Sequence, residues 1–221
     1  GLGLLGLTSL LGLFLTLFAL QGLPLATTTG IFFCYPFLAL ALAAVFLKEE
    51  VGLLVWTLAF LGLTGVFLLF DPQAAGLNLF SLAALGSGAA VAVRMLLTRA
   101  LGLGLPPLTT AAGEALVAAV LLFPFLSLGP LLSAQLLGQL ALYLLFANGS
   151  RLMIVVALSR ADLTALAPLG YSEVVFAALI QWLVLGQGIT PFEAAAFTAI
   201  MAAGLGVAQI RCRPARLAPK A

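Results

Sequence analysis

Histidine is absent from this sequence of 221 residues, and charged residues are scarce. Without histidine the chain holds no histidine metal site, no histidine acid–base catalyst and no H-E-x-x-H protease motif. Only 7% of its residues are charged, against about 25% in a typical globular domain. Because so few charged groups cannot cover a soluble core of this size, the composition excludes an ordinary water-soluble protein.

What the sequence has instead is long apolar runs, separated by its few charged residues. A helix of about 20 apolar residues spans the ~30 Å hydrocarbon core of a bilayer, since each residue rises ~1.5 Å. The runs therefore predict an all-α integral membrane protein with eight transmembrane helices in contact with the lipid bilayer. The predicted helices are 1–20, 25–47, 52–70, 77–97, 107–127, 136–158, 163–185 and 191–210.

The basic residues indicate how these helices are oriented. If the first helix begins in the cytoplasm, all nine Lys and Arg residues fall in cytoplasmic loops or cytoplasmic helix halves. The opposite loops then hold Asp71 and Glu193 and no Lys or Arg. The positive-inside rule then predicts a multi-pass protein of the cell (inner) membrane with both termini cytoplasmic, including a basic tail over 211–221. Cys34 and Cys212 lie on opposite sides in this topology, which excludes a disulfide between them.

Two stretches 138 residues apart follow a similar plan. Residues 19–49 and 157–187 each begin with Ala-Leu, pass through a short polar joint, and enter a helix with aromatic residues that ends at Glu49 or Gln187. The predicted topology gives the two helices opposite orientations in the membrane. Inverted repeats of this kind are typical of secondary transporters.

These stretches also carry a resemblance to a known family. The pattern is Ala19-Leu20, Tyr35-Pro36-Phe37, Glu49 and Gly65-Val66, and it recurs as Ala157-Leu158, Tyr171-Ser172-Glu173, Gln187 and Gly206-Val207. It resembles the EamA-type domain of the drug/metabolite transporter superfamily over essentially the whole chain, and Arg99 matches a basic residue often found there. The second copy departs from the first at Val174, in place of Pro36, and at Gln187, in place of Glu49.

The resemblance implies ten helices in two inverted five-helix repeats. On that basis we expect residues 1–76 to form a first repeat truncated to three helices, and residues 77–210 to form a complete second repeat. The two helices that begin the family's first repeat are expected to precede Gly1.

Four ionisable residues lie within the predicted helices: Arg94, Glu114, Arg151 and Glu173. A charge at a helix centre costs about 2.5–3.5 kcal/mol on insertion, so it normally faces a partner or a cavity. One interpretation pairs Arg94 with Glu114 and Arg151 with Glu173 as structural salt bridges. The other places some of them in a substrate cavity, where the resemblance favours Arg94, Arg151 and Glu173 over Glu114.

Four uncharged polar residues are further candidates for substrate binding: Tyr35, Asn148, Tyr171 and Gln181. Binding pockets combine apolar walls with a few polar groups, although such side chains also make interhelical hydrogen bonds worth ~0.6 kcal/mol on average. Pro36 and Pro168 are predicted to kink their helices.

We therefore predict a transporter that moves a small organic solute by alternating access, with no covalent chemistry, no cofactor, no metal and no nucleic-acid partner. The sequence fits both proton coupling through Glu173 and facilitated flow, and it identifies neither the substrate nor the oligomeric state. The alternatives are a non-transporting scaffold or inactive fragment, and a membrane-embedded enzyme. The enzyme is disfavoured because the sequence has no histidine, no paired carboxylates and no extramembrane catalytic segment.

Overall fold

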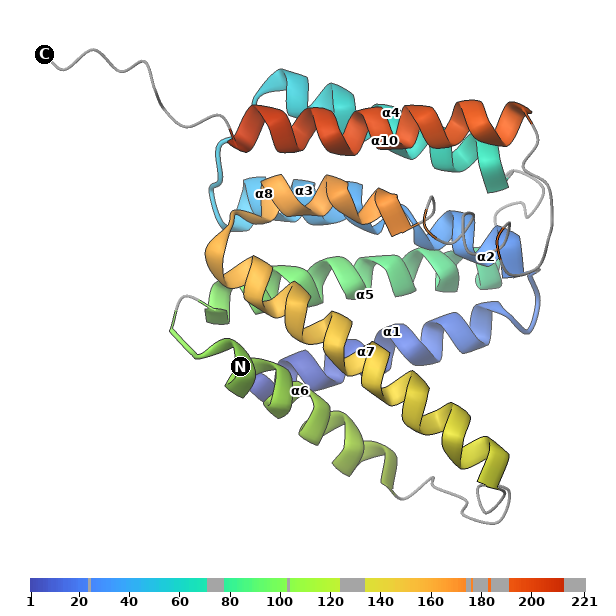
Figure 1. Ribbon diagram of the computed structural model, residues 1–221, viewed down its shortest axis with the longest axis vertical. Helices are drawn as coiled ribbons and strands as arrows, with labels where there is room; N and C mark the ends of the chain where they lie inside the picture. Colours follow the sequence, from blue (N-terminus) through green and yellow to red (C-terminus); the bar gives the residue numbers. More distant parts are fainter. Residues whose placement is uncertain are drawn as a thin grey trace, which may run out of the picture.

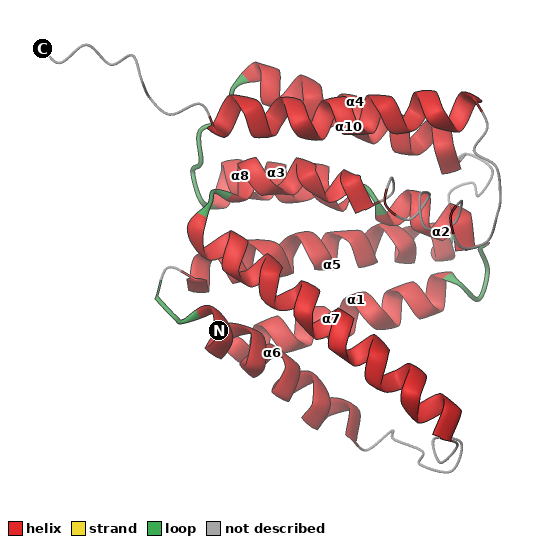
Figure 2. Ribbon diagram, viewed as in Figure 1, coloured by secondary structure: helices red, strands yellow, loops and turns green. Residues whose placement is uncertain are grey.

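The computed structural model describes residues 1–23, 25–70, 78–102, 104–123, 134–173, 176, 183 and 191–212. Within these ranges the chain is helical and contains no strand (Figure 2), which confirms the predicted all-α class. The elements are α1 (Leu2–Ala19), α2 (Leu25–Phe32), α3 (Tyr35–Phe46), α4 (Leu53–Phe70), α5 (Leu79–Gly102), α6 (Pro107–Leu122), α7 (Ala134–Arg160), α8 (Leu163–Leu166), the 3₁₀ helix η4 (Ala167–Tyr171) and α10 (Pro191–Cys212).

Two of the predicted helices are interrupted near a proline. The predicted helix 25–47 is divided into α2 and α3, and Pro36 occupies the first turn of α3. Proline has no N–H to donate to residue 32, and its ring would clash with that carbonyl, which explains the break in the regular helix before Pro36. The predicted helix 163–185 begins as α8 and tightens into η4 around Pro168. The predicted count of eight helices is therefore not confirmed, whereas the distortions at Pro36 and Pro168 are.

The helices form a layered bundle (Figure 1). At one edge α4 packs against α10, and both contact η4. In the next layer α3 packs between η4 and α5, and α5 in turn packs along α1. Helix α6 lies against α1, while α7 crosses the bundle obliquely and contacts both α5 and α6. The arrangement brings segments far apart in sequence, such as α3 and η4, into direct contact.

One end of the bundle collects several chain ends and connections. The start of α1, the link from α3 to α4, the end of α5, the joint between α7 and α8 and the end of α10 all lie at the left in Figure 1. The basic residues Lys48, Arg99 and Arg160 belong to these segments. Basic residues therefore gather at this end of the bundle, together with the acidic Glu49, Glu50 and Asp162.

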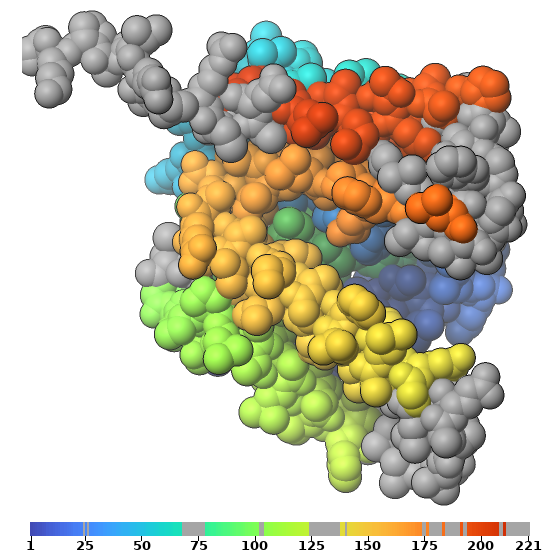
Figure 3. Space-filling model, viewed as in Figure 1, coloured from blue at the N-terminus to red at the C-terminus, as the bar shows by residue number. Residues whose placement is uncertain are grey.

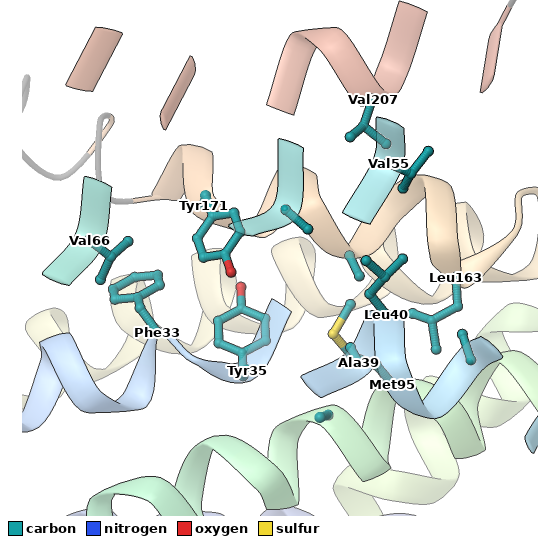
Figure 4. Close-up of a cluster of buried hydrophobic side chains, with 14 of the residues drawn as sticks. Phe33, Tyr35, Ala39, Leu40, Val55, Val66, Met95, Leu163, Tyr171 and Val207 are labelled. Carbon is teal, nitrogen blue, oxygen red and sulfur yellow. The ribbon is translucent and has the colours of Figure 1, made fainter. Parts of the chain in front are cut away.

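The main core lies between α3, α4, α5, α8, η4 and α10 (Figure 4). Leu40, Val66 and Tyr171 are among its fully buried side chains. Glycine allows the close approach of helices here: a Cβ on Gly62 of α4 would lie 2.7 Å from the Tyr171 ring. The glycines of α4 therefore allow tight helix packing, as small residues do in membrane proteins.

Several described helices are suited to a bilayer. Four spans are long and apolar enough to cross a membrane, namely Leu2–Ala19, Thr27–Phe46, Leu79–Leu101 and Ala141–Arg160. Shorter apolar helices occur at Leu53–Phe67, Pro107–Leu122 and Ala194–Val207. On α1 the side chains of Leu4, Leu7, Leu11 and Phe14 are about half exposed, which is the surface that a lipid-facing helix presents.

Candidate functional site

A cavity of about 310 Å³ opens at the centre of the bundle. Figure 3 shows a hollow between the orange segment around α8 and η4 and the yellow-orange α7, with green and blue atoms at its floor. Most of the lining side chains are apolar and come from α2, α5, α7, α8 and η4. The lining consists of Phe32, Tyr35, Val91, Arg94, Met95, Ile154, Ala157, Leu158, Leu166, Leu169, Gly170, Ser172 and Glu173.

Three polar side chains in this wall interact with one another. The Tyr35 hydroxyl and the Glu173 carboxylate are joined by a side-chain hydrogen bond. The Arg94 guanidinium acts electrostatically on both of them, and its side chain is only 14% exposed. The cavity therefore presents one positive and one negative group within a mostly apolar wall, as pockets for small polar organic molecules do.

Behind Arg94 lies a second group of charges centred on Glu114. The Glu114 side chain is fully buried, and its Oε1 lies 3.1 Å from Arg151 Nη2 and 3.8 Å from Arg94 Nη1. The Ser9 hydroxyl donates to the same oxygen, while Oε2 has no hydrogen-bond partner among the described residues. Glu114 thus connects α1, α5, α6 and α7.

This arrangement differs in one respect from the predicted salt bridges. The pair between Arg94 and Glu114 is confirmed. The predicted pair between Arg151 and Glu173 is wrong, because the described ion pair of Arg151 is with Glu114. The oblique crossing of α7 carries Arg151 toward α6, whereas Glu173 follows η4 in the cavity wall.

The candidate binding residues are thus distributed over several environments. Tyr35, Arg94 and Glu173 line the cavity. Arg151 does not line it, but its ion-pair partner Glu114 also pairs with Arg94, which does. Tyr171 is fully buried in the core. Asn148 is exposed, and its side-chain amide donates to the Leu144 carbonyl of its own helix at 2.7 Å. Gln181 lies outside the described residues.

A third group of charges was not among the predicted site residues. We call it the end cluster: Glu49, which follows α3, Arg99 of α5 and Asp162, which precedes α8. Arg99 Nη2 lies 2.8 Å from Asp162 Oδ1, and Arg99 Nε lies 3.7 Å from Glu49 Oε1. The sequence offered one signal for it, since Glu49 and Arg99 both belong to the family-like pattern.

Within the end cluster, Glu49 also binds the backbone. Its Oε1 and Oε2 accept hydrogen bonds from the N–H groups of Leu163 and Thr164, at 3.1 and 2.8 Å. Arg99 Nη1 donates to the Leu158 carbonyl at 3.0 Å. Since the first N–H groups of a helix have no partner within it, Glu49 supplies acceptors for α8 from a segment more than a hundred residues away.

The fold is similar to that of a solved crystal structure whose description names no function. The two share 19% sequence identity and a TM-score of 0.77, over 96% of this chain and 77% of the other. Curated proteins provide no match. The model of the EamA-like transporter family matches residues 78–209, from the start of α5 through most of α10. Because the match covers more than half of the sequence and agrees with the apolar helices, the chain belongs to the EamA-like transporter family.

Proposed function

We propose that this protein carries a small organic solute across the cell (inner) membrane by alternating access, and that the solute binds in the central cavity. The observation that carries the proposal is the combination of Arg94 and Glu173 in one apolar wall. A charge in a membrane protein normally faces a partner or a pathway, because burial in lipid is costly. Family membership supports a membrane transporter of the drug/metabolite kind.

The wall chemistry favours a zwitterionic solute with an apolar portion. Arg94 offers guanidinium N–H donors to an anionic group, and Glu173 with Tyr35 offers oxygen atoms to a cationic group. The surrounding leucine, isoleucine, valine and phenylalanine side chains fit an apolar substituent. An anionic solute that uses Arg94 alone is the second candidate.

Glu114 and Arg151 have a supporting role in this proposal. Glu114 holds the Arg94 guanidinium from behind, so that the arginine does not have to pair with Glu173 across the cavity. Arg151 contributes a second positive charge to the same carboxylate. A preorganised polar group loses less conformational entropy when the solute arrives.

We further propose that residues 1–76 and 77–210 are related inverted repeats, the first of them truncated. The family match over 78–209 corresponds closely to the second of these. The end of the bundle that carries Lys48, Arg99 and Arg160 faces the cytoplasm in this proposal, in agreement with the positive-inside rule.

The test is a binding and uptake assay with matched probes on the purified protein in proteoliposomes. The probes are phenylalanine, which is zwitterionic, phenylethylamine, which lacks the carboxylate, and 3-phenylpropionate, which lacks the ammonium. We expect phenylalanine to bind best. We also expect Arg94→Gln and Glu173→Gln each to weaken its binding about 10- to 100-fold, since hydrogen bonds to charged groups contribute ~1.5–3 kcal/mol.

The probes also separate the two residues. Arg94→Gln should leave phenylethylamine binding unchanged, and Glu173→Gln should leave 3-phenylpropionate binding unchanged. Asn148→Ala is the matched control, because Asn148 is exposed and its hydrogen bond among the described residues lies within α7. A folded double variant Arg94→Gln with Glu173→Gln that transports with normal affinity would refute the proposed site.

A further inference from the structure

The end cluster of Glu49, Arg99 and Asp162 lies at one end of the cavity. Met95 and Leu158 both line the cavity; Arg99 follows Met95 by one helical turn, and it donates to the Leu158 carbonyl. Leu166, also in the wall, lies one turn beyond the joint at Asp162. Because one turn is ~5.4 Å, each of these elements runs from the end cluster directly into the cavity wall.

The contacts of the end cluster join segments from distant parts of the chain. Glu49 comes from the link between α3 and α4, whereas its backbone donors belong to α8. Arg99 of α5 binds the last turn of α7 and Asp162. Alternating access requires the two halves of a carrier to move relative to each other. Glu49 belongs to residues 1–76 and its partners belong to residues 77–210, so a separation of these halves at this end must break the contacts of Glu49.

The cluster is also shielded and held in a defined geometry. The side chains of Glu49 and Arg99 are only 11% and 14% exposed, while Asp162 is 52% exposed. Lys48, directly before Glu49, has a φ of 54°, a left-handed conformation that non-glycine residues adopt at a cost. Such conformations persist where the surrounding structure holds them, and here the turn directs Glu49 at the start of α8.

We propose that Glu49, Arg99 and Asp162 form a gate of the transport cycle. The contacts of Glu49 with Arg99 and α8 close this end of the cavity and break when it opens, while Asp162 holds Arg99 in place. The proposal rests on the proposed function, since it needs a carrier whose cavity opens alternately at two ends. The Glu114 group is not part of the proposed gate, because Glu114 is fully buried within the bundle.

The proposal is tested by cysteine accessibility, which needs no knowledge of the solute. Ser172 lines the cavity, and Ser172→Cys in a Cys34→Ala, Cys212→Ala background places one thiol there with little change in size. A membrane-impermeant methanethiosulfonate reagent is applied to the full chain in membrane vesicles of either orientation. The variants are Glu49→Gln and Arg99→Gln, with Arg160→Gln as a control that removes a positive charge at the exposed end of α7.

We expect Glu49→Gln and Arg99→Gln each to raise the labelling rate from the end-cluster side about tenfold or more, because each weakens the contact of Glu49 with the other half of the carrier, which exists only in the closed state. Labelling from the opposite side should fall, since the two open states compete for one population. The double variant should raise the labelling rate only slightly more than the stronger single variant does, because both residues belong to the same contact. Arg160→Gln should leave both rates unchanged.

Three results would overturn the gating role. Equal increases from both sides would show that the variants merely loosen the bundle. Rates equal to those of Arg160→Gln would show that the end cluster does not control access, while leaving the cavity as a binding site. A thiol at position 172 that reacts from neither side in any variant would contradict both this proposal and the proposed function.

Discussion

Replacing Glu114 by glutamine should destabilise the protein more than any other single neutralisation in the described helices. Glu114 is fully buried, forms ion pairs with two arginines at 3.1 and 3.8 Å, and accepts a hydrogen bond from Ser9. Glutamine keeps an acceptor oxygen and nearly the same volume, so the change removes the charge rather than the packing. The two guanidinium groups then lose the buried carboxylate that they share.

The size of the effect follows from the burial of the partners. Removing one member of a buried ion pair costs ~3–5 kcal/mol. The Arg94 side chain is 14% exposed and that of Arg151 is 31% exposed, so water partly solvates the unpaired charge of Arg151. We therefore expect Glu114→Gln to lower the free energy of unfolding by ~3 kcal/mol, measured by reversible unfolding in mixed detergent micelles.

Two further variants make this prediction specific. Adding Arg151→Gln to Glu114→Gln removes one of the stranded charges and should restore ~1 kcal/mol or more. Glu173→Gln is the matched control, because Glu173 is exposed to the cavity, and it should cost ~1 kcal/mol or less. If the free energy of unfolding of Glu114→Gln lies within about 0.5 kcal/mol of that of the unmodified protein, the ion pairs contribute no net stability and our reasoning fails.

Three other predictions concern packing, the cavity and topology. Gly88→Ala should destabilise the protein by ~1–3 kcal/mol in the same unfolding assay, because the new Cβ would lie 2.7 Å from the Phe32 carbonyl oxygen. Gly149→Ala is the control: its new Cβ would have no atom within 4 Å, so it should not destabilise the protein. Tyr35→Phe should weaken phenylalanine binding about 2- to 10-fold through loss of the hydroxyl hydrogen bond to Glu173, and an unchanged Kd would remove Tyr35 from the site. Gly104→Cys in the cysteine-free background should label only from the cytoplasm; labelling from outside would reverse the proposed orientation.

The sequence alone determined which segments are helical and where they are interrupted. Apolar runs of about 20 residues dictate membrane-spanning helices because the bilayer imposes one length on every span. The distortions at Pro36 and Pro168 follow from the missing proline N–H, which is a local effect. The pair between Arg94 and Glu114 could also be predicted, since the two residues lie on consecutive helices of a predicted hairpin.

Only the tertiary structure decided which faces of the helices meet. These helices are apolar on nearly all sides, so their sequences carry no amphipathic signal that distinguishes the interior from the lipid. For that reason the burial of Tyr171, the exposure of Asn148 and the pairing of Arg151 with Glu114 could not be predicted. Glu49 shows the same limit: its partners are backbone N–H groups at Leu163 and Thr164, and every residue except proline carries such a group, so only the packing of α3 against α8 selects these two.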